Sequence, residues 1–264
     1  MTPRLHLPLG MIALLAIATS APALGQAPAL RATVEGAVQR PGVHEFPAGS
    51  RLADAVLAAM PDPRAYPLGA ALLRRDAEIT QTRARAGLLY DLQALQSHAQ
   101  TADEVAAAAA RLRQWLAGLP VTGRVPNRLE PRALEADLRE NRPLADGDRF
   151  LYPLRTDSIR VVGLVAQACE LEHVPLRDAK AYLRDCPPAP VADRDWLYVI
   201  QPDGHVERLG IAAWNRSASH PLAPGAVLYV PLSERELRDI DAGFNAALAD
   251  FIATQPLPAA GAAR

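Results

Sequence analysis

The stretch Val34-Glu35-Gly36-Ala37-Val38-Gln39-Arg40-Pro41-Gly42-Val43 decides the fold of the first half of the chain. Apolar residues alternate from Ala32 to Val38, which predicts a half-buried strand. Arg40-Pro41-Gly42 is typical of a tight turn, and Val43 to Phe46 follows as a return strand. The stretch therefore predicts a β-hairpin, in which Gly36 allows a bulge or the close approach of a neighbouring strand.

A weak copy of this stretch occurs in the second half as Val161-Val162-Gly163-Leu164-Val165. Further matches follow in the same order: Leu52, Asp54 and Ala55 with Leu176, Asp178 and Ala179; Arg128-Leu129 with Arg208-Leu209; Pro143 to Gly147 with Pro221 to Gly225; and Pro153-Leu154 with Pro231-Leu232. The spacing between the copies falls between Ala55 and Arg128, so the first copy contains an insertion of about 44 residues.

The inserted segment has the pattern of two amphipathic helices. Leu88, Leu92 and Leu95 form one apolar stripe within Asp76 to Ser97. Thr101 and Glu104 have the spacing of a capping box for a second helix. Its stripe contains Val105, Leu112, Trp115, Leu116 and Leu119. We expect a helical hairpin at about residues 76–119 that packs on itself and on the first domain.

The other elements predicted for each copy are a short helix and further strands. The helices are Leu52 to Met60 and Leu176 to Leu183, the strands of the second copy are Trp196 to Gln201 and His205 to Leu209 around a Pro202-Asp203-Gly204 turn, and the closing strands are Phe150 to Tyr152 and Val227 to Val230. Strands that pack a helix on one face indicate an α+β unit of about 75 residues.

The first 25 residues have the layout of a secretory signal. Arg4 precedes an apolar stretch from Leu9 to Ile17, and small residues lead to Gly25. This stretch is shorter than the roughly 18 to 20 residues that span a bilayer, which favours cleavage over an uncleaved anchor. No cysteine follows either possible cleavage site. We expect a periplasmic protein that is not a lipoprotein and has no stable membrane insertion.

The end of the chain predicts one amphipathic helix at residues 233–255. Ser233 and Glu236 have the spacing of a capping box, and the apolar stripe consists of Leu237, Ile240, Phe244, Leu248 and Phe251. This stripe can pack on its own domain, which we favour, or bind a partner. The Pro- and Ala-rich tail at residues 256–264 is predicted to be disordered.

The overall charge argues against nucleic-acid binding. The 264 residues have a formal net charge of −1 and a pI near 6.6, and Lys180 is the single lysine. The chain contains two cysteines, Cys169 and Cys186, and export would place them where disulfides form. We favour a disulfide between them, which would stabilise the fold by about 3 kcal/mol. Two buried free thiols are the alternative, because the sequence cannot supply the Cα separation.

The stretch Val34 to Val43, followed by Gly49-Ser50-Arg51-Leu52-Ala53-Asp54-Ala55, resembles the opening of the soluble-ligand-binding β-grasp domain (SLBB). Two such copies at residues 26–157 and 158–232, a helical insertion in the first and a terminal amphipathic helix together resemble the capsule biosynthesis GfcC-like family. The resemblance covers essentially the whole mature chain and implies an α+β fold of two tandem β-grasp domains. The second copy departs from the pattern, because Gln167 to Glu172 replaces the Pro-Gly turn.

No convergent catalytic or metal-binding group is evident in the sequence. The histidines lack metal-ligand spacing, and no G-x-S-x-G motif is present. The acidic pairs Asp146 with Asp148 and Asp193 with Asp195 lie in turn-like segments, where we expect solvated loops. We therefore predict no enzyme activity, no metal and no cofactor.

Arginine and tryptophan are the candidate ligand contacts. A guanidinium pairs well with carboxylate or phosphate groups of an acidic polysaccharide, which points to Arg40 and Arg51 beside the first turn and helix. Arg74, Arg75, Arg83 and Arg85 cluster at the entrance of the inserted hairpin, but arginines on a helix surface are more often solubilising, and we favour that role for them. Trp196 and Trp214 are possible sugar-stacking platforms, although core positions suit them better.

The family resemblance implies a non-enzymatic periplasmic accessory of capsule or exopolysaccharide biosynthesis and export. Its partners would be the polysaccharide or components of the outer-membrane export channel. Two alternatives remain at this point. A periplasmic carbohydrate-active enzyme would require a deep cleft with converging carboxylates, and a structural adaptor would bind an export-channel protein without binding glycan.

Overall fold

A computed structural model describes residues 29–258 of the chain. The predicted signal at residues 1–25 and residues 259–264 of the predicted tail lie outside this range. The first half contains β1 (Leu30–Gly36), β2 (Gly42–Phe46), α1 (Leu52–Ala59), η1 (Pro67–Gly69), β3 (Ala71–Leu73), α2 (Arg75–Ser97), α3 (Asp103–Gly118), β4 (Arg124–Val125), α4 (Pro131–Ala136) and β5 (Asp148–Tyr152).

The second half repeats this plan, except that no long helices separate the two strands that correspond to β3 and β4. It contains β6 (Ser158–Gly163), β7 (Cys169–Glu172), η2 (Ala179–Arg184), β8 (Trp196–Ile200), β9 (Val206–Gly210), β10 (Val227–Val230), α5 (Glu234–Leu237) and α6 (Phe244–Ala253). In the described residues no helix is long and apolar enough to cross a bilayer.

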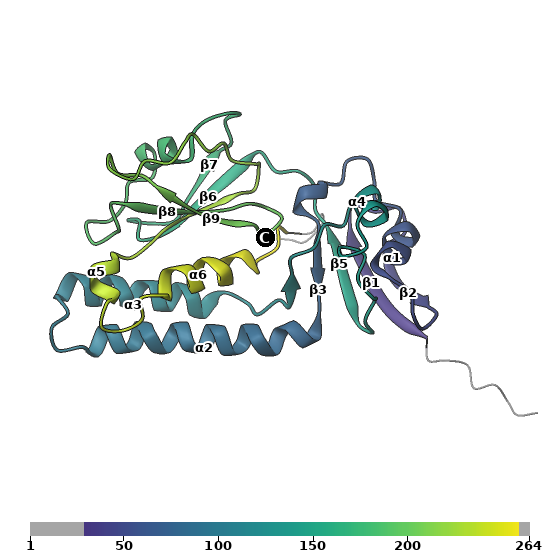
Figure 1. Ribbon diagram of the computed structural model, residues 1–264, viewed down its shortest axis with the longest axis horizontal. Helices are drawn as coiled ribbons and strands as arrows, with labels where there is room; N and C mark the ends of the chain where they lie inside the picture. Colours follow the sequence, from purple (N-terminus) through teal and green to yellow (C-terminus); the bar gives the residue numbers. More distant parts are fainter. Residues whose placement is uncertain (1–28, 259–264) are drawn as a thin grey trace, which may run out of the picture.

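The two five-stranded sheets have the same strand order. They run β2-β1-β5-β3-β4 and β7-β6-β10-β8-β9, and each has one parallel pair at its centre, β1 with β5 and β6 with β10. The outer pairs are antiparallel in both sheets. The predicted α+β fold of two tandem β-grasp units is confirmed (Figure 1).

Two equivalent glycines explain why the repeated motif is visible in the sequence. Gly36 and Gly163 both have φ +94°, a conformation that side chains rarely adopt. A Cβ on Gly36 would lie 2.1 Å from the Tyr152 carbonyl oxygen, and a Cβ on Gly163 would lie 2.3 Å from the Val230 carbonyl oxygen. Each glycine therefore allows the first strand of its half to approach the parallel partner.

The repeat alignment needs one correction, in the helix of the second half. The isolated bridge between Arg51 and Pro143 corresponds to the bridge between Asp178 and Pro221, so Ala179 rather than Leu176 is the counterpart of Leu52. Leu176 is 84% exposed and has a positive φ, whereas Ala179 is fully buried. The predicted helix Leu176 to Leu183 is instead the 3₁₀ helix η2, because the exposed loop extends to Asp178.

The inserted hairpin packs on the second half, which contradicts the expected packing on the first domain. Helices α2 and α3 connect β3 with β4, and their predicted stripe residues Leu88, Leu92, Leu95, Leu112 and Leu116 are buried. These side chains share one apolar core with β6, β8, β10 and α6. Figure 1 shows α2, α3 and α6 along the lower side of the second sheet.

The predicted terminal helix is interrupted. It consists of α5 and α6, separated by a turn in which the Asp241 carboxylate accepts the backbone N–H of Gly243. This side-chain bond competes with the helical backbone bonds. The two predicted capping boxes are also wrong, because neither Ser233 before α5 nor Ala102, the N-cap before α3, makes a side-chain capping bond.

Candidate functional site

The arginines predicted to contact ligand in the first half have different roles. Arg51 precedes α1, and its Nη1 donates to the Asn141 carbonyl oxygen at 2.6 Å. Its backbone N–H donates to the Asp54 carboxylate at 2.7 Å. Arg51 therefore braces α1 against the loop before β5, while Arg40 extends into solvent from the β1–β2 turn. The structure does not join either residue to the predicted tryptophans of the second half.

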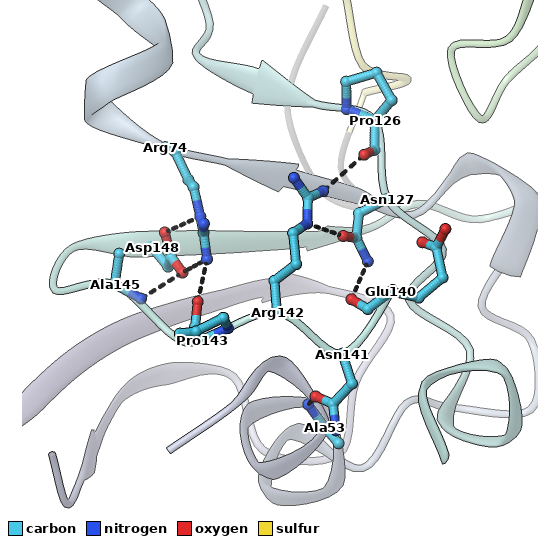
Figure 2. Close-up of polar contacts among 10 residues, drawn as sticks. All are labelled: Ala53, Arg74, Pro126, Asn127, Glu140, Asn141, Arg142, Pro143, Ala145 and Asp148. Carbon is cyan, nitrogen blue, oxygen red and sulfur yellow. Dashed lines mark hydrogen bonds and ion pairs between the residues drawn. The ribbon is translucent and has the colours of Figure 1, made fainter. Parts of the chain in front are cut away.

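A polar network around Arg74 connects the end of β3 with β5 and with the loop before β5 (Figure 2). The Arg74 guanidinium donates to both oxygens of Asp148, at 3.0 and 2.9 Å, and to the Pro143 carbonyl oxygen at 2.6 Å. The side chain of Asp148 is 1% exposed, and that of Arg74 is 14% exposed. Burial raises the pKa of Asp148 despite the backbone N–H of Ala145 and the Arg74 charge, which both lower it.

A second arginine extends this network toward the loop after β4. Arg142 donates through Nε to the Asn127 side chain at 2.7 Å and through Nη2 to the Pro126 carbonyl oxygen at 2.8 Å. Burial is the main cause that lowers the pKa of Arg142, and the nearby Arg74 charge adds to it. The Asn141 side chain accepts the N–H of Ala53 in α1. Both guanidiniums are thus committed to holding loops, which makes this region a brace.

One member of each acidic pair departs from the solvated loops that we predicted, whereas Asp146 is exposed. Asp148 is buried against Arg74, and Asp193 is 9% exposed. The Asp193 carboxylate accepts the backbone N–H groups of Asp195, Trp196 and Glu234. The prediction failed because each aspartate satisfies backbone donors that a loop would otherwise leave unpaired. In the described range, no group of three or more His, Cys, Asp or Glu residues can hold a metal ion.

Arg124 in β4 joins the two halves, and we did not predict this role. The residue is 4% exposed, and its guanidinium donates to the carbonyl oxygens of Pro202, Ala253 and Gln255. Burial lowers the pKa of Arg124 to about 10. Its partners belong to the β8–β9 turn and to the end of α6, so one side chain connects three segments. A single arginine in a two-residue strand carries no sequence signal for such a contact.

Trp196 and Trp214 meet in the second half and form an aromatic platform. Their ring centroids lie 6.2 Å apart with the planes nearly perpendicular. Arg208 lies over the Trp196 ring, 3.7 Å from its centroid, and pairs with Glu234. Trp196 is half-buried, but Trp214 is 72% exposed, so the expectation of a core position is wrong for Trp214. The contribution of Arg208 was not predicted.

Hydrogen bonds tie the loop that carries Trp214 to β9 and to Asp195, directly before β8. Asp195 accepts the indole N–H of Trp214 at 3.3 Å, and its backbone oxygen accepts the N–H of Ile211 and the side-chain amide of Asn215. Gly210 donates to the Ser217 hydroxyl at 2.9 Å. A Cβ on Gly210 would lie 1.9 Å from the Asn215 carbonyl oxygen, so the loop returns tightly onto the end of β9. Trp214 is therefore displayed on a preorganised loop.

The predicted partner-binding stripe of the terminal segment lies in the core of the chain itself. Leu237, Phe244, Leu248 and Phe251 are at most 2% exposed, and Ile240 packs partly buried against the same core. They are not free to bind a partner, because α2, α3 and the second sheet cover them. The intramolecular alternative, which we favoured, is the one that the structure shows. Leu257 of the predicted disordered tail also packs, against Gly69 and Gly225.

The two cysteines form a disulfide. Cys169 in β7 is bonded to Cys186 after η2, with the Cα atoms 6.2 Å apart. This bond connects the edge strand of the second sheet to the segment that covers it. The alternative of two free thiols is thereby excluded in the structure.

Comparison with known proteins agrees with the division into two halves. The family model "Capsule biosynthesis GfcC, N-terminal" matches residues 32–155, and "Capsule biosynthesis GfcC C-terminal" matches residues 167–256. The chain is also similar to the "Uncharacterized protein YjbG" of Escherichia coli strain K12. The two are 29% identical over 187 residues, which cover 69% of this chain and 76% of that protein.

Proposed function

Because the chain belongs to the GfcC family of capsule biosynthesis proteins, we propose that it is a periplasmic accessory protein of capsule or exopolysaccharide export. In this proposal it has no catalytic step of its own. It binds a glycan or a component of the export machinery through its β-grasp units. The observation that carries the proposal is the match of both halves to the two GfcC models.

The polar groups of the structure support a binding role over a catalytic one. Asp148 and Asp193, the buried members of the acidic pairs, are committed to Arg74 and to backbone N–H groups. A general acid or base needs a carboxyl group within reach of a substrate proton. The exposed Trp214 instead offers a contact surface that requires no chemistry.

The charged, apolar and small-residue layout of residues 1–25, which is typical of a secretory signal, supports the proposed location. Osmotic-shock fractionation, with a known cytoplasmic enzyme and a known periplasmic enzyme as markers, tests it directly. We expect the chain in the periplasmic fraction, shortened by the signal. Recovery of the full-length chain with the cytoplasmic marker would contradict the location.

Deletion of the gene tests the proposed role. We expect the deletion strain to have less surface polysaccharide or polysaccharide of altered chain length, and a plasmid copy of the full chain to restore both. Gel electrophoresis and uronic-acid assay of the surface polymer measure the outcome. Unchanged amount and unchanged length would refute the role in export, whatever the location of the protein.

A further inference from the structure

The loop that carries Trp214 also forms one wall of a hollow. This hollow has a volume of about 550 Å³ and is lined by Asp178, Lys180, Arg184 and Arg216, together with Gly210, Ile211 and the serines at 217 and 219. Residues 211–219 thus carry the exposed indole of Trp214 and also contribute Ile211 and Arg216 to Ser219 to the lining of a basic hollow. Neither feature is part of the arginine network of the first half.

Apart from Asp178, the charged groups that line the hollow are all positive. Asp178, its one carboxylate, already accepts the backbone N–H groups of Lys180 and His220. Lys180 donates to the Ile211 carbonyl oxygen, which leaves its ammonium charge without an acidic partner. Arg184 and Arg216 are exposed, and within the described range neither side chain has a hydrogen-bond or ion-pair partner. Three cations therefore face the hollow with one engaged carboxylate.

The neighbouring acids are paired elsewhere. Asp185 beside Arg184 forms an ion pair with Arg177, and Glu207 in β9 lies 3.2 Å from the His220 ring. Glu234 pairs with Arg208 on the Trp196 ring. These acids do not neutralise Arg184 or Arg216 directly, so an anionic ligand could pair with both guanidiniums.

The geometry points to an anionic polysaccharide as the ligand of this loop, and this inference rests on the proposed function. We propose that one sugar ring stacks on Trp214, while carboxylate or pyruvyl groups of neighbouring sugars pair with Arg184, Arg216 and Lys180. The C–H face of a sugar suits the electron-rich face of an indole. Asp195 and Asn215 hold the loop in place and offer polar groups to hydroxyls at its rim.

The surroundings of Trp214 favour a glycan over a protein partner. A protein-docking hot spot is an aromatic side chain within an apolar patch that excludes water. The contacts of Trp214 are instead the half-buried Trp196 and the charged Asp195, beside a hollow lined by cations. A chain of hydroxyls and carboxylates matches this mixture of one aromatic face and several polar groups.

Isothermal titration with two forms of one polymer tests the inference. The probe is the exopolysaccharide of the encoding strain, purified and cut to short oligosaccharides, in its native form and after chemical reduction of its carboxyl groups. Trp214→Ala should lower the affinity for both forms about tenfold, the loss typical of one aromatic stacking contact. Arg184→Ala/Arg216→Ala should lower the affinity for the native form about fivefold in low salt and leave the reduced form unaffected.

Matched variants on the hairpin serve as controls. Tyr90 in α2 is 72% exposed, as Trp214 is, so Tyr90→Ala removes an aromatic side chain of equal exposure. Arg83→Ala/Arg113→Ala removes two exposed arginines outside the hollow. Both controls should bind the native oligosaccharides as the unsubstituted protein does.

Three results would overturn the inference: no binding of the native oligosaccharides, equal binding by Trp214→Ala, or an equal loss in the Tyr90→Ala control. Loss of an export-channel protein from pull-downs with Trp214→Ala, without any glycan binding, would also overturn it in favour of a protein ligand. None of these results changes the outcome expected from the gene-deletion test. The inference can therefore fail while the proposed function stands.

Discussion

The two halves of the molecule share one sheet topology but cover their sheets differently. The first sheet packs α1 and α4 on one face, and its other face carries polar residues such as Arg31, Thr33 and Arg149 around a hollow. In the second sheet every residue of β10 and nearly every residue of β8 is buried. The long helices α2 and α3 start in the first half but cover the second sheet. An insertion in one repeated unit can thus cover the sheet of the neighbouring unit.

The sequences of the central strands reflect how many faces of each sheet are covered. Polar and apolar residues alternate in β1, which is typical of a sheet with one solvated face. The strands β8 and β10 read WLYVI and VLYV, continuous apolar runs that indicate a sheet covered on both faces. The signal for a second layer was present in these runs, and our prediction did not use it.

The largest expected loss of stability comes from breaking the ion pair between Arg74 and Asp148 in the first half. Arg74→Ala leaves the Asp148 carboxylate buried and unpaired, which should cost about 4 kcal/mol of unfolding free energy at pH 7. Without Arg74, the pKa of Asp148 in the folded state rises further above its unfolded value. A raised folded pKa means that stability is highest at low pH and is lost as the pH rises through that pKa.

Chemical denaturation at pH 5 and pH 7 measures this effect. The deficit of Arg74→Ala relative to the unsubstituted protein should be smaller at pH 5. The double variant Arg74→Ala/Asp148→Asn has no carboxyl group at position 148, so its deficit should change much less between the two pH values. An equal deficit for Arg74→Ala at both pH values would contradict a buried, unpaired carboxylate.

A core substitution in the inserted hairpin should weaken the second half selectively. Leu92→Ala removes a side chain that is 1% exposed, which should cost about 3.5 kcal/mol. Hydrogen exchange should then speed up at the amides of β8 and β10 and change little at β1 and β5. Leu134→Ala in α4 is the matched control and should show the reverse pattern, since Leu134 belongs to the core of the first half.

Removal of the disulfide should also affect the second half alone. Cys169→Ala/Cys186→Ala opens a loop with a sequence separation of 17 residues. The expected cost is about 3 kcal/mol in the chain-entropy model. Thermal unfolding followed by hydrogen exchange should locate the loss at β7 and η2. Equal unfolding temperatures with and without the disulfide would show that the bond does not stabilise this edge of the second sheet.

The exposed Trp214 of the second half should contribute little to stability. Trp214→Ala removes a side chain that is mostly exposed, so the unfolding free energy should change by about 0.5 kcal/mol or less. Denaturant titration measures it. A loss above about 2 kcal/mol would be typical of a core residue and would make the indole a structural element of its loop.

Local features were predictable because they depend on neighbours in the chain. The β1–β2 hairpin, the stripe of Leu88, Leu92 and Leu95, and the repeated glycines Gly36 and Gly163 follow from backbone geometry and helical periodicity. The start of η2 was misplaced because Leu176 and Asp178 offered a plausible but incorrect match to the first copy. The candidate site was predicted in part, since Trp196 and Trp214 were named and Arg208 was not.

The duplicated sheet, the inserted helices and the family to which they belong could all be inferred from the sequence. Three features became evident in the folded chain alone: α2 and α3 cover the second sheet, Arg124 joins three segments, and Trp214 is exposed beside Trp196. The physical reason is that an apolar stripe specifies which face of a helix is buried but not the surface that buries it. Partner surfaces are selected by packing among segments far apart in the chain, and local patterns contain no record of that selection.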